Sequence, residues 1–204
     1  SCGRCLERPN PAGSLHSSTA GRTPEATVAI THRGFAPAML ALVDAFPSSN
    51  RQQRQDELLP SLAALVAAGL PDDQEEWLPV LYCSVDGASD SNHRVSLPSL
   101  EILRDVVGQV GERALPFLGT VAPVVAAGLG DSKVAVREAA FGVLVALLAV
   151  DYEFKVTLEH MGAYLGHRSW RVRAGLVDGL GSTLQHFGAS VYGSGHDQVG
   201  ENEP

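Results

Sequence analysis

One segment of the chain recurs at a fixed distance. When Val136 of DSKVAVREA is placed on Val172 of HRSWRVRAG, the offset is 36 residues, and Arg137 falls on Arg173. The earlier segment SNHRVS places Val95 41 residues before Val136. A period of this length that holds two helices is typical of an α-solenoid, in which each helical pair buries its apolar face only against its neighbours. The sequence therefore predicts an all-α array of stacked helical hairpins.

Apolar residues keep a helical spacing from about residue 35 to residue 190. Polar segments interrupt that spacing at PSSN (47–50), GASDSN (87–92), GDS (130–132) and GHRS (166–169). These and the breaks between them divide the chain into four helical pairs, at about 35–69, 73–110, 113–149 and 152–187. Because a proline inside a helix removes a backbone donor, we expect the second helix of the second pair either to begin at Ser96 or to bend at Pro98.

The two ends of the chain differ from this helical region. Residues 1–34 are rich in Gly, Pro, Ser and Thr, and residues 191–204 are polar, so we expect a disordered leader and a disordered tail around a domain at 35–190. Cys2 and Cys5 form a CxxC pair, but no second pair completes a zinc site, and we expect neither a metal nor another cofactor. The apolar run at 141–150 is about half the length that crosses a bilayer, so we expect no membrane partner.

The charge of the chain limits the class of partner. The formal net charge is −8, which argues against nucleic acid, because nucleic-acid binding needs a basic face. Basic residues nevertheless gather at the polar breaks after residue 87, namely Arg94, Lys133, Arg137, Arg168, Arg171 and Arg173. If those breaks align along one edge of the solenoid, they form a basic stripe that favours an acidic protein partner.

Four short motifs, taken in order, carry a family resemblance. The segment LGDSKVAVREAA (129–140) resembles the loop and second helix of a HEAT repeat, with Arg six residues after Asp. The wider order is similar to an N-terminal TOG domain of the CLASP family, whose elements match NHRVS (92–96), GDSK (130–133), HRSWRVR (167–173) and a helix ending in FGA (187–189). The resemblance covers about residues 50–190. It implies a partial TOG domain, with about four of the six HEAT repeats that such a domain has.

The resemblance also implies a function. TOG domains of this family are non-enzymatic and contact tubulin through the loops inside each repeat, so the expected partners are αβ-tubulin or microtubules, and the expected location is the cytoplasm, at the cytoskeleton. Carried over to this sequence, the contact residues are Asn92, His93, Arg94, Lys133, His167, Arg168, Ser169 and Arg171. The first loop lacks the Trp that many TOG domains place against tubulin, and offers Arg51 and Arg54 instead.

Some of these residues also have structural interpretations. Arg137 and Arg173 occupy a HEAT position whose guanidinium bonds a loop aspartate, and because His167 replaces that aspartate in the last repeat, we expect Arg173 to reach back to Asp131. Trp170 is predicted to pack at the start of its helix; exposed, it would instead be a partner hot spot. Trp77 is predicted to lie in the core.

A scaffold protein is the alternative function, in which a solenoid binds other proteins on its concave face rather than through its loops. An enzyme is a more distant alternative. The Ser, His and Asp of GSGHD (193–197) are neighbours in a tail and cannot hold the geometry of a triad. The glycines of GLVDGLG (175–181) do not follow a strand, so they do not form a phosphate loop; we expect them to admit a neighbouring helix.

Overall fold

The computed structural model describes residues 32–47 and 49–192, which are helical with short connections and contain no strand. The first helix of each pair is α1 (His32–Ala45), α4 (Gln74–Ala88), α6 (Leu118–Leu129) or α8 (Lys155–Gly162). The second helices are α2 (Arg51–Gln53), which continues through the π-helical turn η1 (Arg54–Leu58) into α3 (Leu59–Ala68), then α5 (His93–Val110), α7 (Val134–Val150) and α9 (Trp170–Tyr192). Short 3₁₀ segments, η2 (Gly111–Phe117) and η3 (Ala163–Gly166), precede α6 and follow α8.

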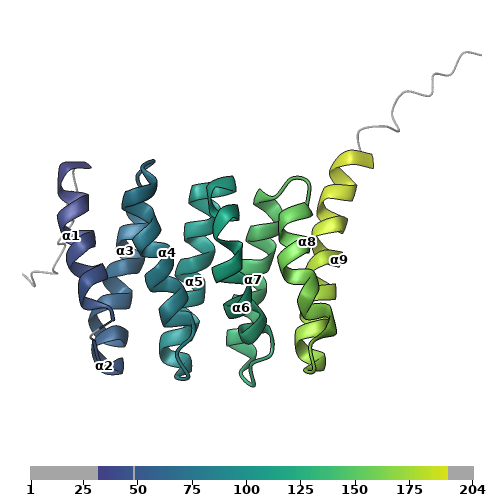
Figure 1. The fold of residues 1–204 in the computed structure, drawn as a ribbon, viewed down its shortest axis with the longest axis horizontal. Coiled ribbons are helices and arrows are strands. Elements are labelled where there is room, and N and C mark those ends of the chain that lie inside the picture. Colours follow the sequence, from purple (N-terminus) through teal and green to yellow (C-terminus); the bar gives the residue numbers. More distant parts are fainter. Residues whose placement is uncertain (1–31, 48, 193–204) are drawn as a thin grey trace, which may run out of the picture.

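The helices form two layers that stack in chain order, as Figure 1 shows. In one layer α1 contacts α4, α4 contacts α6 and α6 contacts α8; in the other, α3, α5, α7 and α9 contact one another in the same order. In the first three pairs the first helix also packs against the second, as α4 does on α5 and α6 on α7, and in the last pair η3 contacts both α8 and α9. The predicted α-solenoid of four helical pairs is therefore confirmed.

The boundaries differ from prediction at three places. Helix α1 begins at His32, so residues 32–34, which were assigned to the leader, are helical, and α9 continues to Tyr192, into the predicted tail. The rest of the predicted leader and tail lies outside the described residues. Of the two alternatives predicted for α5, a start at Ser96 is wrong: the helix begins at His93, with Pro98 inside it. Asn92 caps this start, because its Oδ1 accepts from the backbone N–H of Arg94 at 3.1 Å.

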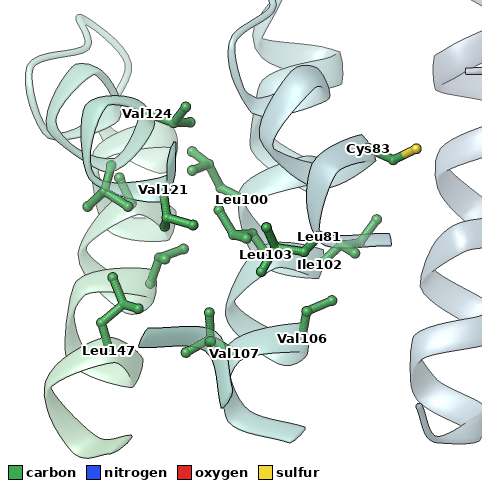
Figure 2. Close-up of a cluster of buried hydrophobic side chains, with 14 of the residues drawn as sticks. Leu81, Cys83, Leu100, Ile102, Leu103, Val106, Val107, Val121, Val124 and Leu147 are labelled. Carbon is green, nitrogen blue, oxygen red and sulfur yellow. The ribbon is translucent and has the colours of Figure 1, made fainter. Parts of the chain in front are cut away.

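One apolar cluster joins all four pairs, from Met39 in α1 to Leu176 in α9. Its centre is built from α4, α5, α6 and α7, with Leu103, Val107 and Val121 fully or almost fully buried (Figure 2). Trp77 is 0% exposed and packs edge-on against Phe117, with ring centroids 5.8 Å apart, which confirms its predicted place in the core. Each pair therefore depends on its neighbours for burial.

The segment His93–Leu129 is long and apolar enough to cross a membrane, judged by length and composition alone. It is not one straight helix, because Gly111 takes a φ of 61° between α5 and η2. Its buried residues, among them Leu103 and Val125, belong to the central cluster. Its composition is accounted for by the core positions of α5 and α6.

Two of the three glycines of GLVDGLG (175–181) in α9 admit a neighbouring helix, as predicted. A Cβ on Gly175 would lie 2.9 Å from Cδ2 of Leu129, and a Cβ on Gly179 would lie 2.5 Å from Cδ2 of Leu144. Gly181 has nothing within 4 Å of that position, so the explanation fails there.

Candidate partner-binding edge

The loops inside the four pairs lie along one edge of the solenoid, the lower edge in Figure 1. They join α1 to α2, α4 to α5, α6 to α7, and η3 to α9. We call this surface the loop edge; it comprises residues 46–47, 49–50, 89–92, 130–133 and 167–169 with the first turn of each following helix. Alignment of the loops is what the basic stripe requires, and the fold provides it.

The last three loops share one turn. In each, the side chain of the third residue before the following helix accepts a hydrogen bond from a backbone N–H two positions on. The pairs are Asp90 Oδ1 with Asn92 N (2.8 Å), Asp131 Oδ1 with Lys133 N (2.6 Å) and His167 Nδ1 with Ser169 N (3.1 Å). The same spacing of 41 and 36 residues that aligns the sequence motifs relates these turns. His167 thus replaces the loop aspartate in its hydrogen bond as well as in sequence.

The eight predicted contact residues divide into two groups. Asn92, His167 and Ser169 are half-buried and shape the loops through the hydrogen bonds just described. The other five are exposed: His93, Arg94, Lys133, Arg168 and Arg171. Within the described chain, the side chains of Arg94, Lys133 and Arg168 make no ion pair or hydrogen bond. These three and Arg171 give the loop edge its available positive charge.

Arg137 and Arg173 have a structural role, but their partners are carbonyl groups. The Nη1 of Arg137 donates to the carbonyl oxygens of Asp131 (2.8 Å) and Ser132 (2.9 Å). The Nη1 of Arg173 donates in the same way to His167 (2.5 Å) and Arg168 (3.3 Å). The prediction that Arg173 reaches back to Asp131 is wrong: its own loop supplies acceptors, and Arg173 forms no ion pair among residues 32–47 and 49–192.

Trp170 is the second correction at this edge, because it is 65% exposed and does not close the gap between repeats. It is the first residue of α9, and the guanidinium of Arg171 lies 5.8 Å from its ring centroid. A hollow of about 320 Å³ opens beside it between α7 and α9, with Phe141 and Val134 in its lining. Sequence periodicity did not identify Val134 as an exposed apolar residue; it lies at the start of α7 and is 57% exposed.

The first loop contributes less free charge than its sequence indicates. Arg51 lies 3.3 Å from Asp90 and donates to the hydroxyl of Ser91 at 2.8 Å. Arg54 lies 3.0 Å from Asp86 and stacks over the ring of Phe46, 4.7 Å from its centroid. The two ion pairs, Arg51 with Asp90 and Arg54 with Asp86, join the first pair to the second. Sequence reasoning could not find them, because the partners lie more than thirty positions away.

Comparisons with known proteins identify relatives. CLIP-associating protein 1-A of Xenopus laevis is 31% identical over 123 residues, which are 58% of this chain and 8% of that protein. CLIP-associated protein of Arabidopsis thaliana is 35% identical over 107 residues, 52% of this chain and 7% of that protein. The chain is similar to these CLIP-associating proteins over about half of its own length. It spans less than a tenth of the length of these relatives, and no protein-family model matches it.

A solved structure supports the fold of this chain. The crystal structure of the MAST/Orbit N-terminal domain superposes with a TM-score of 0.61, over 73% of this chain and 66% of that one, at 18% sequence identity. The likeness shows an α-solenoid of the TOG and HEAT type, as the sequence predicted. The described residues hold no cluster of three or more His, Cys, Asp or Glu side chains placed for a metal; Cys2 and Cys5 lie outside them.

Proposed function

We propose that this chain is a non-enzymatic, microtubule-associated domain that binds tubulin or the microtubule lattice through its loop edge, in the cytoplasm. The proposal draws on the homology to CLIP-associating proteins and on the TOG-type fold. The observation that carries it is the row of exposed cations on three successive loops of a chain whose formal charge is −8. Such a row favours contact with an acidic partner.

The mechanism would be differential affinity. Loops that contact tubulin more favourably in one assembly state than in another shift the population toward that state by the difference in binding free energy. The loops are suited to this, because internal hydrogen bonds hold Asp131 and His167 in place before a partner arrives. Little conformational entropy is then lost on binding.

Co-sedimentation with microtubules over a salt series tests the proposal. The double variant Lys133→Ala/Arg168→Ala removes two cationic side chains that make no hydrogen bond or ion pair within the described chain. We therefore expect it to fold normally and to lose binding about tenfold or more at low salt. Binding of the unaltered chain should weaken as salt rises.

A matched control separates position from charge. Arg104→Ala/Lys155→Ala also removes two exposed cations, from the middle of α5 and from the start of α8 at the opposite edge. We expect this control to bind within about twofold of the unaltered chain, because its cations lie away from the loop edge. Equal loss in both double variants, or unchanged binding in the first, would contradict binding through the loops.

The alternative function, a scaffold for other proteins, is favoured by the hollow between α7 and α9. This hollow lies on the layer of second helices and combines exposed Trp170 and Val134 with Phe141. Trp170→Ala together with Val134→Ser would then abolish binding of a partner while leaving microtubule co-sedimentation unchanged. If the same variant abolishes co-sedimentation, the hollow belongs to the tubulin-binding surface instead.

A further inference from the structure

The loop between α4 and α5 differs from the next two at one position. Ser96 lies 41 residues before Arg137, where the repeat alignment places the arginine that bridges two carbonyl groups of its loop. The equivalent carbonyl oxygens, those of Asp90 and Ser91, accept no hydrogen bond from the described residues. This loop therefore lacks the internal guanidinium that Arg137 and Arg173 supply to the others.

A hollow of about 350 Å³ lies at this place, and we call it the Ser96 notch. Its lining includes Asp90 and Ser91 of the loop, Ser96 of α5 and Asp131 of the next loop, with Val124 of α6 as part of an apolar wall. The volume is about ten times the share of one molecule in liquid water, about 30 Å³. It is large enough for a long side chain with a polar end.

Ser96 is a polar residue of α5 that lines the notch, and its hydroxyl has no protein partner in the described residues. The residue is 5% exposed. Two other buried serines behave differently: Ser84 donates to the carbonyl of Val80, and Ser99 to that of Val95, each at 2.8 Å. The oxygen of the Ser96 hydroxyl is not fully enclosed, so a ligand or water in the notch can reach it.

The charge of the notch identifies the kind of ligand. The Oδ1 atom of Asp90 accepts from Asn92 N and contacts Arg51, and the Oδ1 of Asp131 accepts from Lys133 N. The Oδ2 atoms of both aspartates have no hydrogen bond to the described residues. Carboxylate and carbonyl oxygens spread around one hollow suit a planar guanidinium with five donors better than the compact ammonium of lysine.

We propose that the Ser96 notch binds an arginine side chain presented by a partner protein. That side chain takes the place that Arg137 and Arg173 occupy in the next two loops, with its stem along the apolar wall and its guanidinium at Asp90 and Asp131. The proposal concerns the chemistry of one hollow on the loop edge, and it does not require that the partner be tubulin.

The test uses the full chain and a small probe. N-acetyl-arginine amide is titrated into isotope-labelled protein, and amide chemical shifts are followed by NMR, with N-acetyl-lysine amide as the comparison. We expect saturable shifts centred on Ser91, Ser96 and Asp131, and about fivefold or more weaker binding of the lysine probe. No saturable shift at these residues, or equal binding of both probes, would overturn the proposal.

Two variants and one control sharpen the result. Ser96→Arg fills the notch from within and should abolish the shifts. Asp131→Asn keeps an oxygen for the N–H of Lys133 but removes the charge, and should weaken the arginine probe about fivefold or more. Asp178→Asn, an exposed acid beside the hollow between α7 and α9, should leave the affinity unchanged.

The Asp131→Asn result decides the question even if Ser96→Arg fails to fold, which circular dichroism would show. Unchanged affinity in Asp131→Asn, or a folded Ser96→Arg that still binds the probe, refutes the notch. Because no tubulin is present, these outcomes are independent of co-sedimentation, so the failure of either proposal leaves the other standing.

Discussion

At the scale of single residues, the cations of the loop edge divide by what their side chains contact. Arg137 and Arg173 donate to carbonyl groups of their own loops, whereas Arg94, Lys133 and Arg168 have no such contact within the described chain. The first kind maintains the loop shape, and the second kind is available to a partner. A substitution at each kind should therefore affect a different measurement.

Replacing Arg137 with lysine tests the structural kind. Lysine is one bond shorter and lacks the outer nitrogen that bridges the carbonyl oxygens of Asp131 and Ser132, so we expect Arg137→Lys to lower the free energy of unfolding by about 1 kcal/mol. Urea denaturation measures this. Arg104→Lys is the control, since the guanidinium of Arg104 pairs with the exposed neighbour Asp105, and the change should alter stability by less than about 0.5 kcal/mol. Similar losses in both would contradict the role of the carbonyl contacts.

Cys83 offers a pH-dependent test at the same scale. Burial, and secondly the charge of Asp86, raise the pKa of the Cys83 thiol to about 11, with Arg54 acting weakly in the opposite direction. The folded chain therefore carries less thiolate at pH 8 than the unfolded chain, so Cys83 should react with an aromatic disulfide about tenfold or more slowly when folded. As pH rises above the ordinary thiol pKa, unfolding should become easier, because only the unfolded thiol ionises. Cys83→Ser should remove the slow phase of the reaction with the disulfide. If the slow phase persists in that variant, it does not come from Cys83.

Residue patterns predicted which positions matter at the loop edge better than they predicted the contacts made there. The repeat alignment placed Arg173 on Arg137 and His167 on Asp131, and the structure confirms both equivalences through matching hydrogen bonds. The prediction of a partner for Arg173 was wrong. Its acceptors are backbone carbonyl groups six and five positions back, and every residue has such a group, so the side-chain sequence does not reveal them. The prediction that Trp170 packs between repeats was wrong, because the spacing of apolar residues does not show whether a residue lines an open hollow or fills a closed gap.

At the scale of the element, the glycines of α9 show where α7, the neighbouring helix of the same layer, packs closely against it. We expect Gly179→Ala to lower the free energy of unfolding by about 1–2 kcal/mol, because its Cβ would lie 2.5 Å from a methyl group of Leu144, which is itself buried. Gly181→Ala, two positions on, meets nothing within 4 Å and should raise stability by about 0.5–1 kcal/mol through helix propensity. Chemical denaturation of both variants gives the comparison. Stabilisation by both would mean that α7 and α9 can separate without loss.

Helix positions were predictable because the apolar period and the polar breaks agree across all four pairs. The start of α5 was less so: the proline rule favoured Ser96 or a bend, but the side chain of Asn92 stabilises a start at His93, five positions before Pro98. The ion pairs of Arg51 with Asp90 and of Arg54 with Asp86 were not predictable, since they depend on the packing of one pair against the next.

At the scale of the whole molecule, a single core cluster predicts a single unfolding transition. Leu103 is 0% exposed at the centre of the cluster, so Leu103→Ala should lower the free energy of unfolding by about 3 kcal/mol. In a Trp170→Phe background, the fluorescence of Trp77 and the helical circular dichroism should change at the same denaturant concentration. Leu40→Ala, at a position 51% exposed in α1, should have a small effect. Two separated transitions would show that the pairs unfold independently.

The stacking of the pairs also sets the distance between successive loops. Neighbouring helices in a packed layer lie about 10 Å apart, so each loop is displaced from the next by a step that the core, rather than the loop, determines. Arg94, Lys133 and Arg168, which lie in or beside successive loops, are therefore held at set intervals along the edge. A partner with the same net charge but a different spacing of its acidic groups would match one cation at a time. Substitutions deep in the core, where the step is set, would then alter partner choice without touching the contact surface.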